Sequence, residues 1–248
     1  MDKTVLITGG TGGIGAALCT LFAARGFNIV FCFQRDKARA EELVRLCEAE
    51  GAHCVAHQCD IADPAQVSTL FDAVKSQFGA IDVLVNNAGI IGGASKFVDL
   101  APNQLHKVIE TNFYGATYCA QQAARSMGQS FGGSGGSIVN ISSIAALLGS
   151  PNEYVHYAAS KGALESLTIG LAKELGPDGI RVNAVRAGTV DTPIHQTQGN
   201  PERPAMIAQN NPLGRVATPM DIAEAVWWLA QPEAAYVNGA ILPVHGGG

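Results

Sequence analysis

The stretch that most constrains the fold is the N-terminal one, where a short apolar run leads into a glycine-rich turn and then a helical pattern. Val5-Leu6-Ile7 predicts a strand, residues 8–15 read Thr-Gly-Gly-Thr-Gly-Gly-Ile-Gly, and the apolar spacing that follows predicts a helix ending at Gly26. This order of strand, turn and helix places backbone N–H groups and a helix N-terminus against a pyrophosphate.

The glycines of this turn fit two phosphate-binding patterns. The patterns are G-x-G-x-x-G, at Gly10, Gly12 and Gly15, and T-G-x-x-x-G-x-G, at Thr8, Gly9, Gly13 and Gly15. Glycine-rich turns also serve as plain connectors. The position of this turn directly after the first strand favours nucleotide binding.

The alternation of strand and helix continues along the chain. Further strands are predicted at 28–33, 52–57, 81–85, 137–143, 181–185 and 240–242. The intervening helices are predicted at 36–50, from 63 onward, at 102–129, 154–175 and 221–229. Asp36 and Asp63 suit the N-cap positions of their helices. Strands that alternate with helices form a mainly parallel sheet covered on both faces, so residues 1–248 are expected to form a single α/β domain with a seven-stranded sheet.

Unusual residues recur where the predicted strands end. They are the glycine turn, Asp60, the run Asn86-Asn87-Ala88-Gly89, Ser143 and Gly188-Thr189. In open parallel sheets, ligands bind outside the carboxyl ends of the strands. One rim of the sheet therefore collects all of these residues.

Tyr157 and Lys161 lie four residues apart in a helical pattern, so their side chains leave the same face. A phenol has an ordinary pKa of ~10, and a neighbouring ammonium is expected to lower it by favouring the phenolate. Ser143, at a strand end, can hydrogen-bond the oxygen of a carbonyl or alcohol. Together these groups can move a proton on or off a substrate oxygen. Taken alone, however, a Tyr and a Lys at this spacing are more often a surface pair.

Composition excludes several function classes. The chain has 16 Lys and Arg against 21 Asp and Glu, a net charge of -5 and no basic cluster, which argues against nucleic acid as a partner. No apolar run approaches the ~18 residues of a membrane span, and the N-terminus lacks a signal-peptide layout. The six cysteines show no C-x-x-C spacing, so a reducing, cytoplasmic setting and no metal site are expected.

The motifs together resemble the short-chain dehydrogenase/reductase family over nearly the whole chain. The matching residues are Thr8-Gly9-x3-Gly13-x-Gly15, Asn86-Asn87-Ala88-Gly89, Asn112, Ser143 and Tyr157-x3-Lys161. The resemblance implies a doubly wound Rossmann-type domain, a nicotinamide cofactor and a proton relay. In that relay Tyr157 is the general acid/base, Ser143 orients the substrate oxygen, and Lys161 holds the ribose and lowers the Tyr157 pKa. Asn112 would anchor a water; without the motif, it reads as a polar residue that bends a helix.

The resemblance also implies a cofactor site at the carboxyl rim. Its residues are Gly9, Thr11, Gly13, Ile14, Gly15, Arg35, Asp60, Ile61, Asn87, Ala88, Gly89, Tyr157, Lys161, Gly188, Val190 and Thr192. NADP(H) is expected to be preferred over NAD(H), because Phe33 stands where NAD-preferring relatives tend to carry Asp and Arg35 suits a 2′-phosphate. Two residues favour NAD(H) instead. Gly12 stands in place of an Arg found in many NADP-preferring members, and Asp36 is an acidic residue next to Arg35.

Two further departures from the family pattern affect the site. Ala187-Gly188 replaces the usual Pro-Gly, which makes that loop less rigid. The interval from Ser143 to Tyr157 is one residue longer than usual. Either residues 149–153 carry the extra residue or the role of the serine falls on Ser142; the second position of the pair, Ser143, is favoured.

The expected activity is hydride transfer between NAD(P)(H) and a small ketone, aldehyde or alcohol, because no Arg cluster marks a phosphate-bearing or CoA-bearing substrate. The alternative is a catalytically silent nucleotide-binding protein on the same fold. Residues 193–212 are expected to cover the substrate. Helix 154–175 carries apolar or small residues around much of its circumference, which predicts burial against a second copy in a homotetramer.

Overall fold

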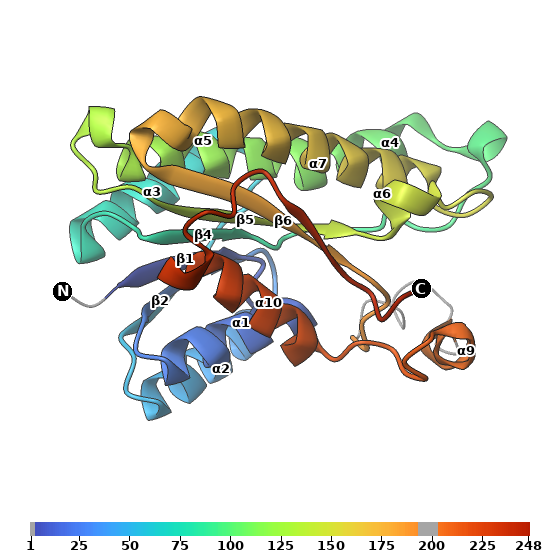
Figure 1. Ribbon diagram of the computed structural model, residues 1–248, viewed down its shortest axis with the longest axis horizontal. Coiled ribbons are helices and arrows are strands. Elements are labelled where there is room, and N and C mark those ends of the chain that lie inside the picture. Colours follow the sequence, from blue (N-terminus) through green and yellow to red (C-terminus); the bar gives the residue numbers. More distant parts are fainter. Residues whose placement is uncertain (1–2, 193–202) are drawn as a thin grey trace.

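Three layers make up the computed structural model, which describes residues 3–192 and 203–248: a parallel sheet lies between two sets of helices (Figure 1). Within the described residues seven strands form one sheet in the order β3-β2-β1-β4-β5-β6-β7, and every neighbouring pair is parallel. The strands are β1 Thr4–Thr8, β2 Asn28–Phe33, β3 Cys54–Gln58, β4 Val83–Asn86, β5 Gly136–Ser143, β6 Ile180–Ala187 and β7 Ile241–Val244. The predicted doubly wound α/β fold is confirmed.

Helices cover both faces of the sheet. On one face lie α1 Gly13–Ala24, α2 Lys37–Ala49 and α10 Pro219–Ala230. On the other lie α3 Pro64–Phe78, α4 Pro102–Ile109, α5 Ala116–Met127, α6 Ala145–Leu148 and α7 Val155–Leu175 (Figure 1). Helix α9, Arg203–Asn210, stands apart near the end of the chain. Short helical turns are η1 Phe97–Asp99, η2 Glu110–Gly115, η3 Gln129–Phe131, η4 Gly176–Asp178 and η5 Pro232–Ala234.

Strand β1 shows why the strands read as continuous apolar runs. Val5 and Ile7 pack into the core cluster on the α1 side, whereas Leu6 packs into the cluster on the α3 side, and all three are fully buried. A central parallel strand has no solvent face, so polar alternation is absent from its sequence.

Several helix starts follow local sequence. The Asp36 carboxylate caps α2 by accepting from the Arg39 N–H, and Asp63 caps α3, whose first residue is Pro64. Both predicted caps are confirmed. Thr218 forms a reciprocal capping box with Asp221, so α10 begins two residues before the predicted start.

The helical region predicted over roughly 102–129 is helical as far as Met127, but it is not a single α-helix. Helix α4 passes into a π-helical segment, η2, before α5 begins, and α5 ends at Met127. The Asn112 side chain is drawn out of the helix pattern because it pairs with the backbone of Ile90, 22 residues earlier. A π segment accommodates such an insertion and often marks a functional site.

Candidate active site

A cavity of about 990 Å³ runs along the carboxyl ends of the strands. Every cofactor residue named from the sequence lines it, as do Ser143, Tyr157 and Lys161. Asn112 is the exception among the sequence-predicted site residues. The cavity extends from the residues that follow β2 and β3, past the first glycine turn, to His245 after β7.

The glycine turn is compact because three of its glycines admit no side chain. Gly9 has φ +67°, a Cβ on Gly10 would lie 2.4 Å from the Phe31 ring, and one on Gly15 would lie 2.2 Å from the Gly9 carbonyl oxygen. A Cβ on Gly12 would lie 3.3 Å from its nearest neighbour, the same oxygen. The structure therefore explains Gly10 and Gly15 of the first sequence pattern and Gly9 and Gly15 of the second, and it explains Gly12 less fully.

Thr8 and Asn87 tie the turn to the end of β4. The Thr8 hydroxyl accepts from the N–H groups of Asn87 and Ala88, both at 3.0 Å. In return the Asn87 amide donates to the carbonyls of Thr8 at 2.8 Å and Gly9 at 3.1 Å. These reciprocal bonds hold the ends of β1 and β4 in one wall of the cavity.

The end of β2 presents cationic side chains to the same cavity. Arg35 lines it as expected, and so does Arg39, one turn into α2, which the sequence analysis missed. Gln34 donates to the Asp60 carboxylate at 2.7 Å and so links this loop to the one after β3. A helix pattern marks Arg39 as a solvated residue, and only the fold brings it beside Arg35.

Ser143 and Ser142 point to different partners. The Ser143 side chain interacts with the Tyr157 phenol, whose pKa it lowers, and its hydroxyl accepts from the Ala145 N–H at 3.2 Å. The Ser142 hydroxyl donates to Glu165 at 2.8 Å instead. The geometry therefore favours Ser143 as the partner of Tyr157. The intervening loop holds Ser150 and Asn152 at positive φ, where the extra residue was expected.

The expected lowering of the Tyr157 pKa is wrong for this structure. Burial raises the pKa of the Tyr157 phenol above its ordinary value, and the interaction with Ser143 offsets this only in part. Lys161 donates from Nζ to the Ile141 carbonyl at 2.7 Å, and its Nζ lies 5.8 Å from the centroid of the Tyr157 ring. Burial lowers the pKa of Lys161 to about 8. Desolvation thus outweighs the attraction between the two groups.

Asn112 lies behind the cavity wall. Its side chain accepts from the Ile90 N–H at 2.8 Å and donates to the Ile90 carbonyl at 2.9 Å and the Ser160 hydroxyl at 3.0 Å. Ser160 in turn donates to the Tyr157 carbonyl at 2.7 Å. Asn112 therefore joins the loop after β4 to the helix that carries Tyr157.

The far end of the cavity has apolar walls and a few polar groups. The apolar residues are Ile91, Ile144, Leu148, Tyr154 and Ile207, and the polar ones include Asn211 and His245. Ile207 and Asn211 lie in segment 193–212, which the sequence predicts to cover the substrate, although it suggests no role for either residue. Residues 193–202 of that segment lie outside the described residues. His245 went unnoticed, because a lone His near the last strand carries no spacing signal.

The donor set fits a dinucleotide. Glycines at positions that admit no side chain form one part of the cavity wall, and Arg35 and Arg39 line another part. The hydroxyls of Ser143 and Tyr157 and the amine of Lys161 lie farther along the sheet. Among residues 3–192 and 203–248, no group of His, Cys, Asp and Glu is arranged to hold a metal ion. In the same ranges, no helix combines the length and apolar character of a membrane span.

Comparison with known proteins identifies the family. A short-chain dehydrogenase family model, described as enoyl-(acyl carrier protein) reductase, matches residues 9–248. The chain is 39% identical to the uncharacterized oxidoreductase YgfF of Escherichia coli K12 and covers 98% of both chains. It is 37% identical to 3beta-hydroxysteroid dehydrogenase 1 of Eggerthella lenta, covering 99% of this chain and 93% of the other.

A solved structure shows the same fold. The short-chain dehydrogenase/reductase of Serratia marcescens superposes with a TM-score of 0.91 at 33% identity, covering 99% of this chain and 97% of the other. Shared fold alone does not establish chemistry, but here the family match spans nearly the whole sequence. The chain belongs to the short-chain dehydrogenase/reductase family and is an oxidoreductase that interconverts a carbonyl and an alcohol with a nicotinamide dinucleotide.

Proposed function

We propose that Tyr157 is the general acid/base of this oxidoreductase, assisted by Ser143, Lys161 and Asn112. The observation that carries the proposal is that Ser143, Tyr157 and Lys161 line the same cavity as the glycine turn. A substrate oxygen that meets both hydroxyls is oriented by one and exchanges a proton with the other.

The phenol of Tyr157 is the proton donor in carbonyl reduction. At neutral pH the phenol is protonated, so it can protonate the oxygen of a carbonyl substrate. The bound nicotinamide supplies the hydride in this direction and accepts it in the reverse one. The Lys161 ammonium stabilises the phenolate left behind, and Asn112 positions the helix through Ser160. Alcohol oxidation needs the phenolate, so its rate should rise with pH while carbonyl reduction falls.

We propose that the cavity-lining residues named from the sequence bind the cofactor and that NADP(H) is preferred. Arg35 and Arg39 offer two guanidinium groups at the end of β2, and the Asp36 carboxylate is engaged as the cap of α2. The test compares kcat/KM for both cofactors in wild type, Arg35→Ala and Arg39→Ala. A wild type that prefers NAD(H), or an Arg35→Ala variant with unchanged NADP(H) affinity, would overturn this preference.

The substrate we propose is a small ketone, aldehyde or secondary alcohol, covered in part by residues 193–212. Ile207 of α9 lines the cavity, which supports this covering role. The six cysteines are free and buried, which supports a reducing compartment such as the cytoplasm.

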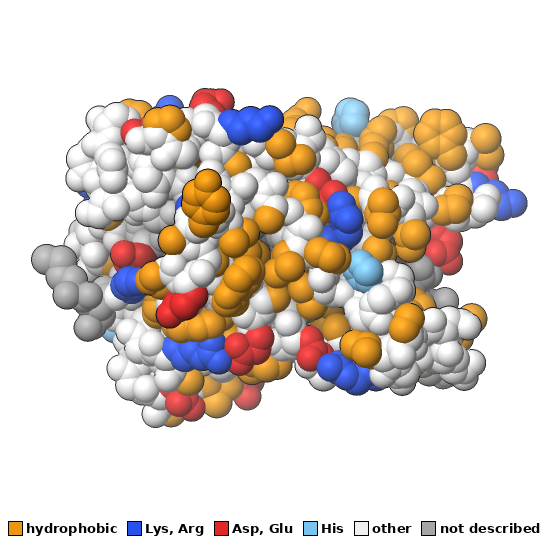
Figure 2. Space-filling model, viewed as in Figure 1, with side chains coloured by type: hydrophobic (Ala, Val, Ile, Leu, Met, Phe, Trp, Pro, Cys, Tyr) orange, Lys and Arg blue, Asp and Glu red, His pale blue; other side chains and the backbone are white. Residues whose placement is uncertain are grey.

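We also propose a homotetramer, because two faces expose more apolar or small surface than a monomer needs. Ala159, Ile169 and Gly170 are exposed on α7. On another face, apolar side chains gather over α10 and the C-terminal segment (Figure 2), where Trp228 is 43% exposed and Tyr236 fully exposed. Light scattering at micromolar concentration should return four times the 25.7 kDa chain mass; a monomer mass would refute the assembly.

The proton relay is tested by Tyr157→Phe. A panel of ketones and alcohols is assayed with both cofactors by following the absorbance of the reduced nicotinamide. The variant should lose about 10²–10⁴-fold in kcat while cofactor affinity, measured by fluorescence titration, stays near wild type. Tyr154→Phe, at another tyrosine lining the cavity, is the matched control. Near-wild-type kcat in Tyr157→Phe would remove Tyr157 from the relay.

A further inference from the structure

His245 follows the last strand and lies beside the reacting end of the cavity. Ser143 is paired with Ala187 on β6, and Ala187 is paired with Val244 on β7, so the three residues form one row across the sheet. Neighbouring strands lie about 4.8 Å apart, which places the end of β7 roughly 10 Å from Ser143 along that row. His245 comes one residue later and lines the same cavity as Ser143.

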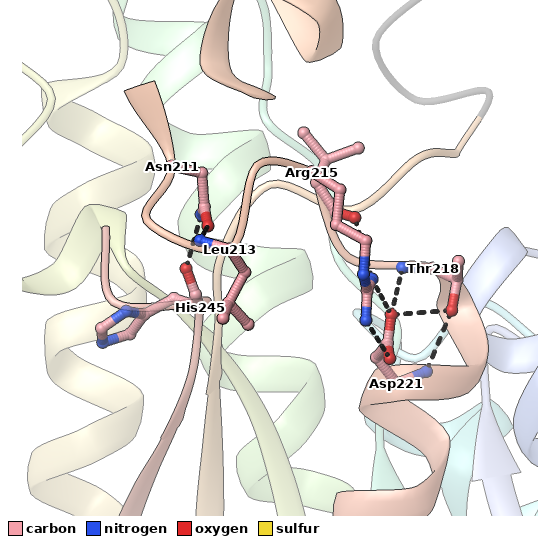
Figure 3. Close-up of polar contacts among 7 residues, drawn as sticks. Asn211, Leu213, Arg215, Thr218, Asp221 and His245 are labelled. Atoms are coloured by element: carbon pink, nitrogen blue, oxygen red, sulfur yellow. Dashed lines mark hydrogen bonds and ion pairs between the residues drawn. The ribbon is translucent and has the colours of Figure 1, made fainter. Parts of the chain in front are cut away.

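The backbone of His245 is fixed from two sides. The Gly188 N–H donates to the Val244 carbonyl at 2.9 Å, and the Asn211 amide donates to the His245 carbonyl at 2.9 Å (Figure 3). Asn211 is itself held, because its Oδ1 accepts from the Leu213 N–H at 3.0 Å. The position of His245 is therefore set by the fold.

Two glycines permit this close packing. A Cβ on Gly188 would lie 2.8 Å from both Cα and Cβ of His245. A Cβ on Gly246, which has φ +69°, would lie 2.5 Å from Asn211 Oδ1. Real Cβ atoms do not approach so closely, so both positions require glycine for His245 to stand where it does.

One nitrogen of the imidazole is buried without a partner. This atom, Nδ1, has no hydrogen-bond partner among the described residues. The ring points away from Asn211 and from the nearby Arg215–Asp221 pair (Figure 3), whose members are bound to each other at 2.6 Å. A buried nitrogen without a partner is costly, so a water, an ion or a bound molecule is expected to complete it.

The cavity that His245 lines also has apolar residues in its walls. Ile144, Leu148 and Tyr154 come from the segment before α7, and Ile207 comes from α9. A ligand in this cavity can meet both carbon and the imidazole. Such a surface selects a molecule with an apolar body and a polar atom placed away from its reacting carbon.

We propose, on the basis of the oxidoreductase function above, that His245 hydrogen-bonds a second oxygen of the substrate, so that the preferred substrates are hydroxyketones and diols. The reacting oxygen meets Ser143 and Tyr157, and the second oxygen, a few bonds away, meets the His245 ring. His245 is thus a specificity-determining residue, while the apolar wall holds the carbon skeleton.

The test compares substrates that differ by one hydroxyl: 2,3-butanediol against 2-butanol, and 1,2-cyclohexanediol against cyclohexanol. In wild type kcat/KM should favour the diol of each pair. His245→Leu should reduce this preference about tenfold, chiefly through the diol, because a neutral hydrogen bond contributes roughly that factor. His245→Gln retains a donor and an acceptor and should restore part of the preference. His53→Leu, at an exposed histidine that does not line the cavity, is the matched control.

Three outcomes would overturn the proposal. An unchanged diol preference in His245→Leu would show that the ring does not bind the second oxygen. A wild-type protein that does not prefer the diol of each pair would also show that the ring does not bind a second oxygen. An equal rise of the cofactor KM with both members of a pair would assign the ring to the cofactor instead.

A second measurement does not depend on turnover. Diethyl pyrocarbonate should modify His245 in the wild-type protein, and the diol should protect it more than the matching mono-alcohol, as followed by peptide mass spectrometry. Protection without turnover of any substrate would refute the proposed function while supporting the role of His245. Turnover with equal protection by both alcohols would support the oxidoreductase function while refuting the role of His245.

Discussion

The two faces of the sheet bury different kinds of side chain. On the face covered by α1, α2 and α10 the core is an apolar cluster, in which Phe22, Phe27 and Trp227 meet edge to face with ring centroids 5.0–5.5 Å apart. Polar groups on this face, such as Ser137 and Arg181, bind the Leu229 carbonyl near the amino ends of the strands, away from the cavity.

The face covered by α5 and α7 buries polar groups beside its apolar cluster. Asn86 donates to Asn140 at 2.9 Å, and Asn140 donates to Thr168 of α7 at 2.8 Å. Closer to the cavity, Arg186 of β6 binds Glu165 of α7 through two nitrogens, at 2.9 and 2.6 Å.

The two faces of the sheet therefore constrain their helices in different ways. Apolar packing needs volume and tolerates small rotations, whereas hydrogen bonds are directional and fix one orientation of a helix on a sheet. Helix α7 carries Tyr157 and Lys161, so its orientation decides the geometry of the site. The polar links hold that orientation, and four substitutions test the contrast.

The largest effect is expected on the apolar face. Phe22→Ala removes a fully buried ring and should lower the free energy of unfolding by about 3–5 kcal/mol, because the surroundings collapse only partly into the cavity. The activity of the folded fraction should stay unchanged. Urea denaturation and kcat at low temperature measure the two quantities. Phe22→Leu is the control. A reduced kcat in the folded Phe22→Ala variant would show that the apolar face also determines the geometry of the site.

On the polar face, Glu165→Gln should alter both stability and activity. Burial opposes the charge, but hydrogen bonds from Arg186 and Ser142 hold the Glu165 pKa below its usual range. The variant leaves Arg186 without a charged partner and should lower the free energy of unfolding by about 2–3 kcal/mol. This is less than the loss expected when a fully buried ion pair is broken. We expect a lower kcat with unchanged cofactor affinity.

The same lowered pKa sets a pH dependence for the Glu165 pair. The stabilisation is present above the unfolded-state pKa of Glu165 and is lost as pH falls through the lower folded-state value. Chemical denaturation of wild type and Glu165→Gln at several acidic pH values measures this difference. If the stability of wild type and of Glu165→Gln changed equally with pH, the Glu165–Arg186 pair would not be the source of this pH dependence.

Lys161→Met should raise stability while removing activity. Lys161 is 4% exposed, and its pKa is lowered from 10.5 to about 8, so the charged form is penalised in the folded state. We expect a gain of about 1–2 kcal/mol at neutral pH, less than the full shift because the bond to the Ile141 carbonyl is lost.

The sign of this effect can be checked with pH. Between about 8 and 10.5 the unfolded chain binds more protons at Lys161 than the folded one, so wild-type stability should rise with pH in that window. Lys161→Met should lack this rise. A variant less stable than wild type at neutral pH would show that the ammonium supports the fold.

The smallest effect is expected at the rim of the apolar face. Arg25 binds Glu224 at 2.7 Å and stacks over the Trp227 ring at 4.6 Å, but both charged groups remain solvated. Arg25→Ala should change stability by less than about 1 kcal/mol. Thermal unfolding at low and high salt measures it, and a loss above 2 kcal/mol would indicate a larger role for the stacking.

The sequence alone determined what depends on neighbours along the chain. The glycine turn, the caps at Asp36 and Asp63, and the spacing of Tyr157 and Lys161 are local features, and repeated strand–helix units have few ways to pack. Family resemblance added the positions of Asn112 and Ser143, because their order and spacing match a known pattern.

Tertiary structure decided what depends on residues distant in sequence. The π segment at Asn112 follows from its bonds to Ile90, and the direction of the Tyr157 pKa shift follows from burial, which no spacing reveals. Asn211 and His245 meet although 34 residues separate them, and Arg39 lines the cavity beside Arg35 only once α2 has packed next to β2. Burial and long-range contact set these energies, and both arise only once the chain has folded.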